Sequence, residues 1–225
     1  MFKEWNNLSR DFMGENSQIK ELTAGNVHES VLNLIKYKKP GKILDLAAGP
    51  GNMSLFLKKL GFEVIAGDIN IEQFEVKDVE IHEIDANKRL PFDSETFDYF
   101  ISIETIEHLK NPWMFISEAN RVLKSGGTFI ITTPNIETIQ NRIYFLLWGR
   151  LNWFGEEDIT EVGHITPIYS WIFEHMIKDK FKIKKIMYND GEVLGILPRI
   201  GIIIKPFKFN HILFGQIKIM ELQKI

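Results

Sequence analysis

The sequence predicts an α/β protein in which a parallel sheet is covered by helices on both faces. Short apolar runs rich in β-branched residues alternate with amphipathic stretches, as in strands that are joined by helices. A glycine-containing turn follows the first apolar run, and acidic residues end several of the others. Ligands of such sheets bind at the carboxyl ends of the strands, where the strand order reverses.

The first half of the chain alternates helix and strand. Residues 1–30 are polar with a helical pattern that places Phe2, Trp5, Leu8 and Phe12 on one face. A helix expected at 27–37 ends at Lys39-Pro40-Gly41, because proline and glycine stop helices. Apolar runs predict strands at 42–46, 63–67 and 79–84, and the stretches between them predict a helix at 54–60 and a short one at 71–76.

The second half begins with the same alternation. A fourth strand is expected at 97–103, followed by a helix at 112–123 that has a continuous apolar face. Lys124-Ser-Gly-Gly127 is expected to cap this helix, since glycine accepts the left-handed conformation. Pro134 stops a β-branched strand at 128–132, after which the pattern predicts helices at 136–148 and 170–178 and strands at 181–188 and 201–205.

The composition is that of a globular protein. With 225 residues, 44% of them hydrophobic, the chain can bury a sizeable core. Without cysteine it forms neither disulfides nor cysteine-ligated zinc sites. No signal-peptide pattern and no apolar run of membrane-spanning length occurs, so a cytoplasmic location is expected. We expect a single domain over 1–225, divided into a cofactor-binding core (27–135), a lid insertion (136–180) and carboxyl-terminal strands (181–225).

The charge is unevenly distributed. Residues 178–225 carry ten Lys or Arg against four acids, whereas residues 1–177 carry 17 against 26. The basic tail fits contact with an anionic membrane surface, a lipid phosphate or nucleic acid. Alternatively, Lys182, Lys184 and Lys185 simply occupy the solvent side of a strand.

The turn after the first strand predicts a nucleotide-type cofactor site. Gly49 and Gly51 permit a tight turn and a close approach of the backbone to a ligand, and the next helix points its amino end at the same place. Asp68 ends the second strand, where a carboxylate can accept hydrogen bonds from ribose hydroxyls.

Four blocks, "ILDLAAGPG", "VIAGDIN", "EIDANKRLPFDSETFDYFISIETIEHL" and "EANRVLKSGGTFIITTPN", occur in this order over about residues 27–190. In this set the chain resembles class I S-adenosylmethionine-dependent methyltransferases, and especially the ubiquinone-biosynthesis-type O-methyltransferases. The resemblance implies a Rossmann-like, mostly parallel seven-stranded sheet, with an antiparallel seventh strand between the fifth and the sixth.

The resemblance also implies a role for individual residues toward S-adenosyl-L-methionine. Ala47 departs from the pattern because it stands where the family usually has its first glycine; its methyl group is expected to be tolerated. The family assigns Asp45, Gly49 and Gly51 to the amino-acid end of the cofactor, Asp68 to the ribose, Asp85 and Ala86 to the adenine, and Ser102 to the floor beneath the methionine.

A proton acceptor or a metal ion is sought beside the fourth strand. Glu104, Glu107 and His108 have the spacing i, i+3, i+4, which puts them on one face of a helix and offers ligands for Mg²⁺ or Mn²⁺. The pattern is similar to the metal site of small-RNA 3′-end methyltransferases, in which a further His joins; His164 is available here. In the alternative without metal, Glu107 and His108 form a polar cap and His108 or His164 acts as general base.

The segment 141–154 mixes bulky apolar groups with Arg142 and Arg150, where this fold places a substrate-covering insertion. It fits an apolar or lipid-linked acceptor, or a lid that only packs on the body. The leading hypothesis is methyl transfer to an oxygen of a small-molecule or lipid- or sugar-linked acceptor, and nucleic acid is not expected as the partner. The alternatives are a metal-assisted RNA-end 2′-O-methyltransferase, an oxidoreductase and a cofactor-binding scaffold without turnover.

Overall fold

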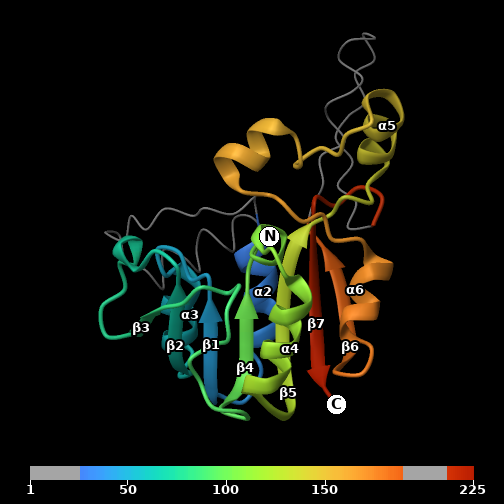
Figure 1. Cartoon of the computed structure of the whole chain (residues 1–225). Helices are drawn as coiled ribbons and strands as arrows, with labels where there is room; N and C mark the ends of the chain where they lie inside the picture. The colour runs from blue at the N-terminus through green and yellow to red at the C-terminus, as the bar shows by residue number, and fades with distance from the viewer. Residues whose placement is uncertain (1–25, 190–211) are drawn as a thin grey trace.

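The computed structural model describes residues 26–189 and 212–225 as a seven-stranded sheet between layers of helices (Figure 1). The strand order is β3-β2-β1-β4-β5-β7-β6. The first five strands run parallel, and β7 runs antiparallel between β5 and β6. The strands are β1 (Lys42–Leu46), β2 (Glu63–Asp68), β3 (Glu80–Glu83), β4 (Phe97–Ser102), β5 (Leu123–Pro134), β6 (Phe181–Tyr188) and β7 (Ile217–Lys224).

Two sets of helices cover the two faces, because side chains alternate along each strand. Ile43, Ile101 and Ile130 face the cluster under α2 and α3, whereas Leu44 and Phe129 face the cluster under α4 and α6. In Figure 1 α4 lies in front of the sheet and α2 behind it. The helices are α2 (Val27–Ile35), α3 (Asn52–Lys59), α4 (Pro112–Val122), α5 (Ile139–Trp148) and α6 (Ser170–Ile177), with short turns η1 (Ile71–Gln73), η2 (Ile106–His108) and η3 (Asp158–Val162).

The predicted fold class is confirmed, including the antiparallel seventh strand. The antiparallel strand is β7 at 217–224, a position that the sequence did not predict. The strand expected at 201–205 lies outside the described residues. The apolar face expected on residues 1–25 also lies outside them. The helix expected at 71–76 is only the single turn η1, because Phe74 is already extended.

The expected glycine cap of α4 is wrong. The helix ends at Val122, and Leu123 is already extended with φ −75° and ψ 142°. The left-handed residue is Gly126, with φ 75°, in the turn that begins β5. Gly127 has no room for a side chain, since a Cβ would lie 2.8 Å from the Lys124 carbonyl oxygen. The two glycines therefore shape a turn within β5, and the first of them lies four residues beyond the helix end.

Three lysines of the basic tail are exposed on β6: Lys182, Lys184 and Lys185. Because β6 is an edge of the sheet, lysines there hinder pairing with another sheet, which agrees with the simpler interpretation of the charge. In the described part of the chain, none of the helices combines the length and the apolarity needed to cross a bilayer.

Candidate functional site

A cleft of about 730 Å³ opens at the carboxyl ends of β1, β2 and β4. Its floor is the turn between β1 and α3 together with the ends of β2 and β3, and its far side is η2. Residues 135–169 rise above this edge of the sheet in Figure 1 and close the cleft through Trp153, Val162 and His164. The site thus lies where the reversal of strand order on either side of β1 and β4 predicts it.

Asp68 holds the glycine turn in place. Its Oδ2 accepts the backbone N–H of Gly49 at 2.8 Å, and its Oδ1 accepts the N–H of Asn70 at 2.9 Å. The amide of Gln73 adds a weaker bond to Oδ1 at 3.3 Å. Asp68 and Gly49 both line the cleft, so the carboxylate lies at the cleft wall and also ties the end of β2 to the turn after β1.

Asp45 is almost fully buried beneath the turn and lines the cleft. Its Oδ2 accepts the hydroxyl of Ser54 at 2.6 Å, which links the end of β1 to the first turn of α3. Burial raises the pKa of Asp45 to about 6, because the low-dielectric surroundings disfavour the charged form, and the Ser54 bond opposes this. The group therefore titrates near neutral pH.

Ala47 adopts a left-handed conformation with φ 64°, which glycine favours and which costs an L-residue about 1–2 kcal/mol. Its N–H donates to the Gly67 carbonyl oxygen at 2.7 Å, and this bond keeps the turn closed despite the strain. The methyl group is accommodated, as expected, and Ala47 lines the cleft. Alanine at position 47 thus raises the conformational energy of the turn, while the hydrogen bond to Gly67 keeps the backbone of the turn in place.

Gly51 and Ser102 do not line the cleft, unlike the other expected contacts. Gly51 caps α3 with φ 97°, and a Cβ there would lie 2.5 Å from the Val76 side chain and 2.7 Å from Phe74. Its glycine is thus required by backbone conformation and packing. Ser102 is fully buried at the end of β4, where its hydroxyl has no hydrogen-bond partner among residues 26–189 and 212–225.

Asp85 and Ala86 line the far end of the cleft beyond β3. The backbone N–H of Asn87 donates to Asp85 Oδ1 at 2.9 Å, and Lys88 Nζ lies 3.3 Å from Oδ2. These contacts, the Asn87 bond first, lower the pKa of Asp85, so its carboxylate is ionised at neutral pH. An ionised carboxylate is a hydrogen-bond acceptor of the kind an exocyclic amine requires.

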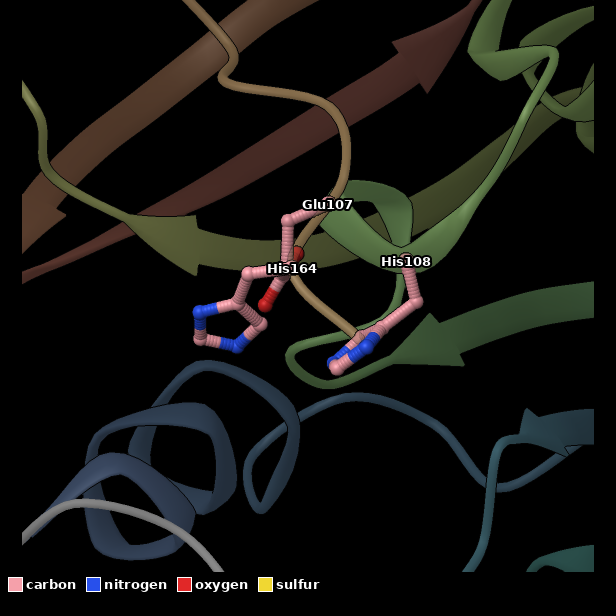
Figure 2. Close-up of side chains that lie close together, drawn as sticks. All are labelled: Glu107, His108 and His164. Atoms are coloured by element: carbon pink, nitrogen blue, oxygen red, sulfur yellow. The ribbon is translucent and has the colours of Figure 1, made fainter. Parts of the chain in front are cut away.

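The expected helical face of Glu104, Glu107 and His108 is wrong, because only η2 is helical. Glu104 precedes η2 with φ 46°, and its N–H donates to Thr132 Oγ1 at 2.9 Å. It still lines the cleft. The group that converges is instead Glu107, His108 and His164, whose ligand atoms lie within 4.8 Å of one another (Figure 2).

Backbone pairing brings His164 to η2 from a distant segment. The carbonyl oxygen of Glu107 accepts the N–H groups of Ile165 at 3.0 Å and Thr166 at 2.9 Å. The two imidazole rings then lie 4.8 Å apart between centroids, at an interplanar angle of 63°. His164 Nδ1 lies 2.9 Å from the Trp153 carbonyl oxygen. Since a carbonyl only accepts, Nδ1 carries the proton and Nε2 of the neutral ring is an acceptor.

The electrostatics of this cluster favour neutral groups. Burial lowers the pKa of His108, and the neighbouring His164 lowers it further, so both act against its cationic form. Burial raises the pKa of Glu107 to about 8, with the charge of Glu104 adding to the effect. Glu107 Oε2 accepts the Thr133 hydroxyl at 3.1 Å, whereas Oε1 has no hydrogen-bond partner in the described part of the chain.

Some cleft residues were not predicted from the sequence. His28 lines the cleft although no site role was predicted for it. The topology explains this, because α2 runs antiparallel to β1 and its amino end lies at the carboxyl ends of the strands. Among the other polar residues that line the cleft without having been predicted are Asn52 and Thr105.

Comparisons with known proteins agree with this geometry. The family described as "Methyltransferase domain" matches residues 44–131. The mitochondrial ubiquinone biosynthesis O-methyltransferase of Rattus norvegicus is 27% identical over 178 residues, which are 74% of this chain and 48% of that protein. The sarcosine/dimethylglycine N-methyltransferase of Aphanothece halophytica is 35% identical over 105 residues, 41% of this chain and 38% of that protein. The chain thus spans less than half the length of these two curated relatives.

Solved structures share the fold. A putative methyltransferase from Bacillus halodurans superposes with a TM-score of 0.66 at 17% identity, covering 88% of this chain and 99% of that one. A SAM-dependent methyltransferase from Archaeoglobus fulgidus gives 0.64 at 18% identity, covering 98% and 99%. The chain therefore shares the fold of S-adenosylmethionine-dependent methyltransferases and matches the methyltransferase domain over residues 44–131.

Proposed function

We propose that the protein transfers a methyl group from S-adenosyl-L-methionine to an oxygen of a small-molecule or lipid- or sugar-linked acceptor. One observation carries the proposal: a single cleft joins Asp68 and Asp85, which suit a nucleoside, to His108 and His164, which suit proton removal. The division into a core (27–135), a lid (136–180) and carboxyl-terminal strands (181–225) and the cytoplasmic location belong to the same proposal.

The cofactor-binding roles follow from the donors and acceptors of the cleft. Asp68 would accept the ribose hydroxyls with the lone pairs that Gly49 and Asn70 leave available, and Asp85 with Ala86 would meet the adenine edge. Asp45 and the turn at Ala47 and Gly49 would meet the amino-acid end. Gly51 and Ser102 would act without lining the cleft: Gly51 would fix the shape of the turn, and Ser102 would fix the shape of the floor beneath the methionine. When bound, the cofactor supplies a methyl group activated by a sulfonium.

The reacting end would align the acceptor and take its proton. His164 is arranged for this task, because Trp153 fixes its tautomer and leaves Nε2 as a proton acceptor. The lowered pKa of His108 keeps that imidazole neutral as well. Alanine substitution of either group should therefore reduce turnover without weakening cofactor binding.

A divalent ion is a second use of the same residues. Glu107, His108 and His164 would hold Mg²⁺ or Mn²⁺, and the partnerless Oε1 of Glu107 supports this fit. Two imidazoles and one carboxylate suit Mn²⁺ better than Mg²⁺, which prefers oxygen ligands. The ion would act as a Lewis acid on the acceptor oxygen. Titration calorimetry with Mn²⁺ alone, on the wild type and on the Glu107→Gln variant, tests this: binding in the former and at least a tenfold loss in the latter are expected.

The charge of the cleft disfavours the RNA-end alternative. Of the described residues, no lysine or arginine lines it, while Asp45, Asp68, Asp85 and Glu104 do. Nucleic acid affinity comes mainly from cations that neutralise phosphates. An oligoribonucleotide should therefore bind weakly at most.

Methyl transfer itself is tested with the donor carrying a labelled methyl group. The labelled donor and a panel of catechols, glycans, lipid intermediates and amines are incubated with the protein, and labelled product is separated and its methylated atom identified. A product methylated on oxygen is expected. A product methylated only on nitrogen would contradict the proposed acceptor, and cofactor binding without any labelled product would favour the scaffold.

A further inference from the structure

Helix α5 exposes apolar side chains around most of its circumference. Of its ten residues only Asn141 is buried. In Figure 1 the helix stands above the sheet, away from the core between the layers. The most exposed apolar side chains follow one another along the chain: Phe145 (54%), Leu146 (82%), Leu147 (60%) and Trp148 (56%). An exposed apolar surface of this kind is typical of a site that binds a protein, a membrane or a ligand.

The arrangement of these side chains fits a lipid surface better than a protein groove. Consecutive residues of a helix are about 100° apart, so four in a row point in nearly all directions around the axis. A protein groove covers one narrow stripe of a helix, whereas the boundary between headgroups and acyl chains takes up the whole broad face that lies against it. Tyr144 and Trp148 stack at 4.8 Å between ring centroids, and such amphipathic rings are enriched at membrane interfaces.

The charge around the helix points the same way. Arg142 and Arg150 flank the apolar run and are both exposed, and residues 138–155 contain no acidic residue. The stretch 138–155 is therefore cationic and apolar, which is complementary to anionic lipid headgroups.

We propose that α5 docks on the surface of a bilayer containing anionic lipid. Phe145, Leu146, Leu147 and Trp148 enter the boundary between headgroups and acyl chains, and Arg142 and Arg150 contact lipid phosphates. Trp153, five residues beyond Trp148, lines the cleft, so the docked helix leads directly to the part of the lid that closes the cleft. Docking there suits an acceptor drawn from the lipid phase, an extension that rests on the proposed function.

The experiment is flotation of the full chain with vesicles of phosphatidylcholine and phosphatidylglycerol at 3:1, and with vesicles of phosphatidylcholine alone. The test variant is Leu146→Glu/Leu147→Glu, in which both substituted side chains are exposed in the wild type. The matched control is Tyr37→Glu, because Tyr37 is 87% exposed and precedes β1, at the opposite end of the sheet. Affinity for S-adenosylhomocysteine is measured for every protein to verify the cleft.

Binding to the mixed vesicles is expected for the wild type and the Tyr37→Glu variant, with at least about a tenfold loss for the double variant. Arg150→Gln should lose about fivefold on mixed vesicles and little on neutral ones. No flotation of the wild type, or equal flotation of the double variant, would overturn the proposal. Concentration-dependent self-association that the double variant abolishes, without flotation, would instead assign α5 to a second copy. Flotation without S-adenosylhomocysteine binding would leave α5 docking intact and refute the proposed function.

Discussion

The two ends of the cleft are built differently. At the cofactor end, polar groups that line it are already paired: Asp68 with Gly49 and Asn70, and Asp45 with Ser54. At the reacting end, His108 and His164 line the cleft, and Glu107 lies buried behind them with one oxygen that has no partner among the described residues. The first end is held in one shape by its own bonds, whereas a polar atom beside the second end is left available for a ligand.

This difference predicts which property, cofactor binding or turnover, a substitution at each end should affect. Under the proposed function, a substitution at the cofactor end would remove a contact with the methyl donor and would also loosen the turn between β1 and α3. A substitution of His108 or His164 would remove a proton acceptor while the cofactor end keeps its shape. Binding and turnover should therefore separate between the two ends.

The largest effect is expected from the imidazoles. His108→Ala or His164→Ala should lower turnover by about 10²–10⁴-fold, the usual contribution of general acid–base catalysis. Affinity for S-adenosylhomocysteine should stay within about threefold, because neither ring belongs to the cofactor end. Steady-state rates and binding titrations on the same protein preparations measure both. Full turnover in both variants would place the reacting end elsewhere.

A smaller effect concerns stability and pH at Glu107. Its pKa is about 8 in the folded protein, against an ordinary value of 4.5, so the folded state holds the proton more tightly. The stabilisation from this group is complete below pH 4.5 and is lost as the pH rises through about 8, with a slope of at most ~1.4 kcal/mol per pH unit. Urea unfolding at pH 5, 6.5 and 8 should show this fall for the wild type.

The Glu107→Gln variant should have a flatter profile over the same range, because its amide does not titrate. Asp45, with a pKa of about 6, contributes a fall of the same sign in both proteins. Glu63→Gln is the control, since Glu63 is exposed at the amino end of β2. Identical profiles for the wild type and the Glu107→Gln variant would show that Glu107 does not hold a proton when folded.

The smallest effect is expected at Ala47. The Ala47→Gly variant should unfold with a free energy ~1 kcal/mol higher, because glycine adopts φ 64° without strain. Part of this gain is offset by the greater entropy of glycine in the unfolded chain. Chemical denaturation measures the difference. A clearly less stable variant would mean that the methyl group contributes more through packing than it costs through strain.

The residues of the cofactor end could be predicted from the sequence more completely than those of the reacting end. Asp45, Gly49 and Asp68 belong to strand ends and a turn within about 25 residues, so alternation and glycine spacing locate them. The pairing of His108 with His164 depends on backbone bonds between Glu107 and Ile165 or Thr166, and local pattern does not encode that contact. The resemblance offered His164, whereas spacing alone wrongly placed Glu104 on a helical face.

The remaining errors have the same origin. Gly126 was expected to be a helix cap because composition does not distinguish a cap from a turn four residues beyond the helix end. His28 was not predicted as a cleft residue because its place depends on the antiparallel path of α2, and β7 was not located because its pairing with β5 and β6 is long-range. Tertiary contacts decide all three.

The central claim is that the end of the cleft formed by β1 and β2 binds the methyl donor through Asp68. Calorimetric titration with S-adenosylhomocysteine tests it most directly, on the wild type, on Asp68→Ala and on Asp93→Ala as an exposed control. We predict one binding site per chain in the wild type and the control, and at least about a hundredfold weaker binding in Asp68→Ala. Unchanged affinity in a folded Asp68→Ala variant, or no binding by the wild type, would contradict the account.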